Sequence, residues 1–226
     1  MAHQLSFDLP AKEVLGRDDF FVSPANAMAV AMIEATPNWP NQKLVLSGPP
    51  GSGKTHLVHV WASLQNAQIV SARDLNFTTV PDLAKAPVAV EDVGDIANND
   101  VGQTALFHLF NLSGANGQPM LMTGRGAPHH WHLSLPDLQS RLSAACHVAL
   151  EAPDDALLSA VLAKLFADRQ ITPKANVIPY LSAHMDRSFQ AAAAIVDRLD
   201  QVSLDEARTV SRALAVRLLG TAPTKP

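Results

Sequence analysis

The sequence predicts an α/β fold in which a parallel sheet is covered by helices, followed by a small all-helical lid domain. In residues 18–151, short and continuously apolar segments such as KLVLS at 43–47 alternate with helical stretches, which is typical of a parallel sheet buried on both faces. In residues 152–226, helical patterns follow one another and no strand pattern is evident. Residues 1–17 have neither period, and we expect them to form a flexible leader.

The expected elements follow in chain order. Residues 26–36, rich in Ala and Met, predict a first helix that Pro37 and Pro40 end. Pro153 and Asp154 favour the start of a later helix, and Ser203 with Glu206 has the spacing of a capping box for the last one. The strand patterns lie at 43–47, 68–71, 87–90, 119–123 and 147–151, and the other helical patterns at 56–64, 102–113, 154–169, 187–200 and 204–219.

The composition excludes several classes of protein. With 226 residues, 47% of them hydrophobic, and a net charge of −4, the chain has enough apolar surface for a buried core. The slightly negative charge excludes a broad surface for DNA phosphates. The single cysteine cannot form an internal disulfide, no secretory signal is visible in residues 1–15, and the longest apolar run, 27–33, is shorter than the roughly 20 residues that span a bilayer. We therefore expect a soluble, cytoplasmic protein.

A phosphate-binding motif follows the first strand. The segment from Gly48 to Thr55, GPPGSGKT, matches G-x-x-x-x-G-K-[ST] and stands between a predicted strand and a predicted helix, as the mechanism requires. Its glycines let backbone N–H groups converge on phosphate oxygens. Lys54 would reach the β- and γ-phosphates, and the Thr55 hydroxyl would bind Mg²⁺. The pattern occurs by chance in only about 1% of random chains of this length.

An acidic pair ends the third predicted strand. Glu91 and Asp92 follow Val88-Ala89-Val90, and in P-loop proteins one such acid holds the Mg²⁺ shell while its neighbour orients the attacking water. We expect Glu91 in the first role and Asp92 in the second. Most P-loop proteins have Asp at the first position, so the longer Glu91 favours nucleotide binding over hydrolysis. The alternative is a pair of solvated acids at a strand end.

The order of these motifs resembles that of the AAA+ ATPases, and among them of the replication initiator DnaA. Residues 20–26, FFVSPAN, are similar to the segment that flanks adenine in that family. Residues 136–142, PDLQSRL, resemble its arginine-finger box, and residues 184–189, HMDRSF, resemble the entry into its lid domain. The resemblance covers about residues 18–219 and implies an AAA+ fold of a P-loop parallel-sheet domain followed by a helical lid.

The resemblance also implies a set of site residues. Arg141 would act in trans on a nucleotide held by a partner, and Thr123 is the plausible substitute for the Ser, Asn or Asp that positions water in the family. We therefore expect a weak intrinsic ATPase with ADP or ATP and Mg²⁺ bound. The residues expected to contact the nucleotide are Phe20, Val22, Pro50, Gly51, Ser52, Gly53, Lys54, Thr55, His56 and Arg187.

The leader carries a second pattern. Gln4, Leu5, Phe7 and Leu9 are similar to the peptides that dock on the DNA polymerase sliding clamp, and an extended peptide of this kind inserts its apolar side chains into a groove. Together with the short chain, this resembles the regulators that stimulate ATP hydrolysis on DnaA and so inactivate it, reaching DNA only indirectly. The alternative is an autonomous ATPase that acts as a helicase or clamp loader. The sequence does not decide whether the chain self-associates or what role residues 129–132 have.

Overall fold

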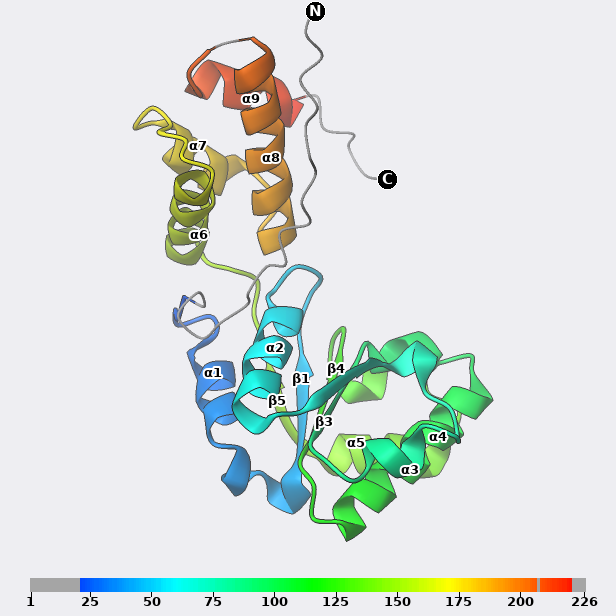
Figure 1. The fold of residues 1–226 in the computed structure, drawn as a ribbon. Helices are drawn as coiled ribbons and strands as arrows, with labels where there is room; N and C mark the ends of the chain where they lie inside the picture. The colour runs from blue at the N-terminus through cyan, green and yellow to red at the C-terminus, as the bar shows by residue number, and fades with distance from the viewer. Residues whose placement is uncertain (1–20, 207, 221–226) are drawn as a thin grey trace, which may run out of the picture.

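The computed structural model describes residues 21–206 and 208–220, and it consists of an α/β part and a helical part (Figure 1). A five-stranded parallel sheet runs in the order β2-β3-β4-β1-β5. The strands are β1 (Lys43–Ser47), β2 (Gln68–Ser71), β3 (Val88–Glu91), β4 (Met120–Gly124) and β5 (Cys146–Ala149). Each coincides with a predicted strand to within about two residues, because each is a short apolar run flanked by turn residues.

Helices cover both faces of the sheet. On one face, α1 (Ala27–Glu34) and α2 (Lys54–Gln65) pack on alternate strand residues such as Leu44 and Leu46. On the other face, α3 (Val80–Leu83), α4 (Asp100–Ala115) and α5 (Pro136–Ala144) pack on the intervening strand residues, such as Val45. Both sets are nearly inaccessible, which explains why the strands have continuous rather than alternating hydrophobicity.

The helical part has a separate core. It consists of α6 (Asp155–Asp168), α7 (Val177–His184), α8 (Phe189–Asp205) and α9 (Arg212–Gly220), which pack around residues such as Leu162, Phe166, Leu181 and Val196. Figure 1 shows these helices grouped at one end of the molecule, beyond the sheet. No helix in the described ranges is long and apolar enough to cross a membrane.

One local prediction is wrong, and three helices were not predicted. The capping box at Ser203 and Glu206 is wrong, because α8 continues through Ser203 to Asp205, and α9 begins only at Arg212. The apolar period that includes Leu199 and Val202 carries α8 across the expected boundary. Helices α3, α5 and α7 were not among the predicted elements. The expected start at Asp154 is confirmed, since its side chain accepts a hydrogen bond of 2.7 Å from the Leu157 N–H.

Candidate nucleotide-binding site

The phosphate-binding motif forms a loop that joins β1 to the N-terminus of α2. Gly51 and Gly53 have φ angles of 69° and 95°, in the left-handed region that side chains disfavour. These turns bring the chain directly into α2, which begins at Lys54. The loop therefore ends at the positive end of a helix of 12 residues, the usual place for phosphate.

Lys54 lies folded over this loop. Its ammonium donates hydrogen bonds of 2.9 Å to the Gly48 carbonyl and 2.8 Å to the Pro49 carbonyl. Burial lowers the pKa of Lys54; the Asp92 carboxylate raises it, the Arg125 charge lowers it further, and Glu91 raises it. An anion at this position would favour the charged form of Lys54, so the environment suits phosphate.

Ser52 provides a second indication that the loop suits a polar ligand. Its Oγ is buried and has no hydrogen-bond partner among the residues that the structure describes. A buried hydroxyl without a partner costs about 1–3 kcal/mol, and such groups often mark a functional position. A phosphate oxygen or a nucleotide-associated water at this loop would satisfy it.

The acidic pair lies beside the start of α2. The Thr55 hydroxyl donates a hydrogen bond of 2.8 Å to Glu91 Oε1 at the end of β3. Asp92, with a φ angle of 55°, donates its backbone N–H to the Thr123 hydroxyl at 3.1 Å. The hydroxyl and carboxylate oxygens of Thr55 and Glu91 are the hard ligands that Mg²⁺ prefers, with waters and phosphates completing its shell. The residues present therefore fit Mg²⁺, which would neutralise phosphate charge there.

The helical part contacts the loop directly. The backbone N–H of Phe189, the first residue of α8, donates a hydrogen bond of 2.8 Å to the Gly51 carbonyl. A Cβ atom on Gly51 would lie 2.6 Å from the Ser188 Cβ. Glycine is thus required at position 51 both for its φ angle and for this close approach.

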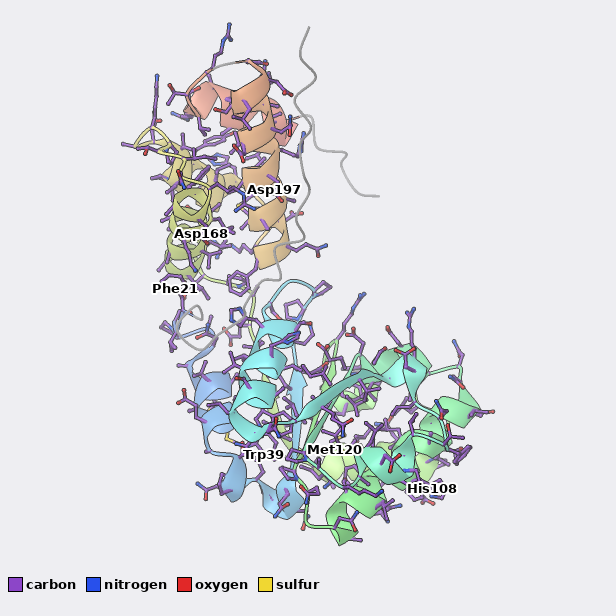
Figure 2. The ribbon with its side chains drawn as sticks, in the orientation of Figure 1. Phe21, Trp39, His108, Met120, Asp168 and Asp197 are labelled. Atoms are coloured by element: carbon purple, nitrogen blue, oxygen red, sulfur yellow. The ribbon has the colours of Figure 1, made fainter. Side chains whose placement is uncertain are left out.

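A cavity of about 820 Å³ lies between the two parts of the molecule. The loop and Asp92 form one side, and apolar residues of α6, such as Leu157 and Leu165, form another. Figure 2 labels two of its lining residues, Phe21 and Asp168 on α6. The full lining comprises Phe21, Pro50, Gly51, Gly53, Lys54, Thr55, His56, Asp92, Arg125, Leu157, Val161, Lys164, Leu165, Asp168, Phe189, Gln190 and Ala193.

Several predicted residues either fall outside the described residues or do not line the cavity. Phe20 and the clamp-peptide residues Gln4, Leu5, Phe7 and Leu9 fall outside the described residues. Val22 is half exposed and does not line the cavity, whereas its neighbour Phe21 does. Arg187 does not line it either; its guanidinium forms an ion pair of 2.7 Å with Asp155.

Arg141 stands apart from the cavity on α5. Its side chain is exposed, and its guanidinium lies over two rings of α4, with its carbon 5.2 Å from the Phe107 centroid and 5.9 Å from that of Phe110. Arg141 does not contribute to the lining of the cavity. The arginine expected to act in trans is therefore presented on the surface against an aromatic support.

Sequence reasoning missed Arg125 and the α6 wall formed by Leu157, Val161 and Leu165. Arg125 is the first residue after β4, and the carboxyl ends of neighbouring parallel strands are where ligands bind in open α/β sheets. The position of Arg125 at the end of a strand could have indicated a ligand contact, but only with the knowledge that β4 lies next to β1. The sequence identified the α6 residues only as part of an apolar helix face and did not indicate that they line a cavity.

The fold, a five-stranded parallel sheet with a phosphate-binding loop and a following helical part, is shared with solved DnaA and RuvB structures. More particularly, it is similar to the fold of domain III of the replication initiation protein DnaA from Thermotoga maritima, with 18% identity over 96% of this chain and 100% of that one and a TM-score of 0.79. It is also similar to a DnaA bound to AMPPCP and single-stranded DNA, with 18% identity over 84% of this chain and 67% of that one and a TM-score of 0.69. A RuvB variant from Thermotoga maritima has a similar fold, with 14% identity over 92% of this chain and 73% of that one and a TM-score of 0.71. No family model matches the sequence.

Proposed function

We propose that the chain is a nucleotide-binding regulator of replication initiation that stimulates ATP hydrolysis on DnaA, in the manner of Hda, the regulatory inactivator of DnaA. One observation carries the proposal: the features for holding a nucleotide surround one cavity, while Arg141 is exposed outside it. An arginine that acts on a nucleotide held by a partner has to be exposed and outside the protein's own cavity, and Arg141 meets both conditions.

The cavity supports binding of ADP or ATP with Mg²⁺. Gly51, Gly53 and the N-terminus of α2 suit the phosphates, Lys54 supplies a positive charge, and Thr55 with Glu91 suits Mg²⁺. The apolar α6 wall suits a nucleobase. A DnaA structure of the same fold binds the ATP analogue AMPPCP, which supports the same ligand class here.

The position of Arg141 supports action in trans. A guanidinium delivered by a partner stabilises charge on the transferred phosphoryl group and accelerates hydrolysis by about 10³–10⁵ in characterised GTPases. The rings of Phe107 and Phe110 restrict the side chain without neutralising it, so the charge is available to a phosphate. In this proposal the ATP belongs to DnaA, and the leader, through residues 4–9, tethers the chain to the sliding clamp.

The alternative function is an autonomous AAA+ ATPase that loads a helicase or clamp. Thr55, Glu91 and Asp92 lie together beside the cavity and could serve hydrolysis in cis. The two functions differ in where turnover occurs. We therefore expect the isolated chain to hydrolyse ATP slowly. ATP-loaded DnaA should hydrolyse its ATP faster when the chain and DNA-loaded clamp are added. Rapid hydrolysis by the chain alone, without any acceleration of hydrolysis by DnaA, would support the loader.

Arg141→Ala tests the proposed trans role. We expect DnaA-ATP hydrolysis to fall to the rate without the chain, because the cation that stabilises the partner's phosphoryl group is removed. Nucleotide affinity and melting temperature should stay unchanged, since Arg141 is exposed and outside the cavity. Arg208→Ala, which removes an exposed arginine of the helical part, is the matched control and should stimulate normally. Normal stimulation by Arg141→Ala would exclude Arg141 as the finger.

A further inference from the structure

The outer side of α4 is accessible to solvent and carries no charge. Residues 101–115 of this helix contain no Asp, Glu, Lys or Arg. The residues of its outer side recur every three or four positions and therefore share one face: Val101, Thr104, His108, Leu112 and Ala115. None of them is buried, and Val101 is 58% exposed. A helix that covers a sheet normally has charged residues on its outer side, so this face is unusual for a surface that contacts only water.

A groove between α3 and α4 extends this uncharged face. It has a volume of about 450 Å³, and it is lined by Phe77, Val80, Pro81, His108, Asn111, Leu112 and Ala115. Phe77 is 50% exposed, and its ring meets that of His108 edge-on with the centroids 5.7 Å apart. Figure 2 shows His108 at the outer edge of the α/β part, on the side away from the helical part. Contiguous exposed apolar surface of this kind marks an interaction site.

The charges around this face favour a second copy of the chain over a charged partner. On α3, Asp82 and Lys85 form an ion pair of 2.7 Å and so contribute no net charge. Arg141 lies over Phe107 and Phe110, which are outside the row of outer residues. A nucleic acid or an acidic protein surface would need cations that the row itself lacks. An identical uncharged face leaves no charge without a partner when the two faces meet.

The spacing of the outer residues lets two copies of α4 fit as an antiparallel pair. Val101 stands seven residues before His108 and Ala115 seven after it, while Thr104 stands four before and Leu112 four after. Around a two-fold axis at His108, the larger Val101 therefore meets the small Ala115 of the second copy. In the same way, Thr104 meets Leu112 of the second copy. This pairing of larger with smaller side chains lets the helices approach closely.

We propose that the chain forms a two-fold symmetric dimer through the outer face of α4, with the two helices antiparallel and His108 at the axis. The face is only about four helical turns long, so the dimer is weak, with a dissociation constant of about 1–100 μM. No residue of α4, which the structure describes in full, lines the nucleotide-binding cavity. The dimer therefore goes beyond the proposed function and does not depend on it.

Sedimentation equilibrium of the full chain between about 1 and 300 μM tests the association. We expect the average mass to rise with concentration toward twice that of one chain. Leu112→Asp should weaken the dimer about tenfold or more, because it places two carboxylates without partners in the interface. Leu64→Asp makes the same change at an exposed leucine of α2, on the other face of the sheet. This matched control should associate like the wild-type chain, and melting temperatures of both variants show that the fold is intact.

Disulfide cross-linking in a Cys146→Ser background tests the antiparallel arrangement. With oxidised glutathione as the oxidant, His108→Cys should give a linked dimer, because a residue at the axis meets its own copy. Val101→Cys and Ala115→Cys should each fail to link alone, since a rise of 1.5 Å per residue separates equivalent positions by about 20 Å. A mixture of these two variants should link.

The outcomes decide the proposal without any measurement of nucleotide binding or of DnaA. A mass of one chain at every concentration overturns the dimer, and so does a dimer that Leu112→Asp leaves intact. Linking by Ala115→Cys alone, or no linking by His108→Cys, overturns the antiparallel pair. A face that binds another protein while the chain stays monomeric would also overturn the proposal and assign the face to that protein.

Discussion

At the residue scale, Lys43 is a charged side chain placed inside a core. It is the first residue of β1 and is about 1% exposed. Its ammonium donates a hydrogen bond of 3.2 Å to the Gln118 carbonyl and lies 5.6 Å from the centroid of the Phe110 ring. Phe110 also contacts Arg141, so the ring that supports the exposed arginine is itself in contact with a buried cation. Burial lowers the pKa of Lys43 from 10.5 to about 8.

This lowered pKa predicts a pH dependence of stability. Between about pH 8 and 10.5 the unfolded chain holds a proton on Lys43 that the folded chain has lost, so the free energy of unfolding rises with pH across that window. Below pH 8 both states are charged and the cost of burying the charge is present in full. In Lys43→Met this contribution is absent, so the free energy of unfolding of the variant relative to wild type should fall with rising pH, by about 3 kcal/mol across this window.

Urea unfolding of both proteins at pH 7, 8.5 and 10 measures this difference. Other titrating groups are common to the two chains and cancel in the comparison. A difference in unfolding free energy that stays constant from pH 7 to 10 would mean that Lys43 keeps its ordinary pKa in the folded protein.

At the scale of elements, α6 connects the stability of the helical part to the shape of the cavity. Asp154 caps this helix by accepting a hydrogen bond of 2.7 Å from the Leu157 N–H, and Leu157 itself lines the cavity. The next residue, Asp155, pairs with Arg187 just before α8. The first turn of α6 therefore contributes to the cavity wall and also binds the segment that precedes α8.

Asp154→Ala should destabilise the protein by about 1 kcal/mol, because a first-turn N–H of α6 loses its acceptor. For a chain of this size the melting temperature should fall by about 2–4 °C per kcal/mol. Asp154→Asn keeps an acceptor oxygen and should lose much less. Thermal unfolding followed by circular dichroism measures both; equal losses would show that the carboxylate charge, and not the cap, is responsible.

The elements also show what the sequence could and could not predict. The strands were predictable because each is a short apolar run between turn residues, and the loop was predictable because its chemistry is local. Helix α5 was recognised only as a motif, since its nine-residue segment PDLQSRLSA buries just two side chains, Leu138 and Leu142. The placement of Arg125 and the pairing of Arg187 with Asp155 depend on strand order and tertiary packing, which spacing along one chain does not contain.

At the scale of the whole molecule, the cavity belongs to both parts of the chain. The loop comes from the α/β part, the apolar wall comes from α6, and the Phe189–Gly51 hydrogen bond joins the two. A ligand that contacts both sides stabilises their relative arrangement through its differential affinity. Phe21 lies at this same junction, because it lines the cavity and its carbonyl accepts a hydrogen bond of 2.8 Å from the Asn26 side chain.

If the proposed clamp docking and nucleotide binding use separate parts of the chain, each can be removed without the other. Deleting residues 1–10 removes Gln4, Leu5, Phe7 and Leu9 but keeps Phe21 and the Asn26 contact. We expect the truncated chain to lose co-elution with the sliding clamp in gel filtration, while its affinity for ADP and its melting temperature stay at wild-type values. Replacing Leu5 and Phe7 by Ala should give the same loss, since the apolar side chains supply the docking energy. Continued co-elution of both variants would place the clamp contact elsewhere on the chain, and weakened ADP binding by the truncated chain would mean that the leader contributes to the cavity.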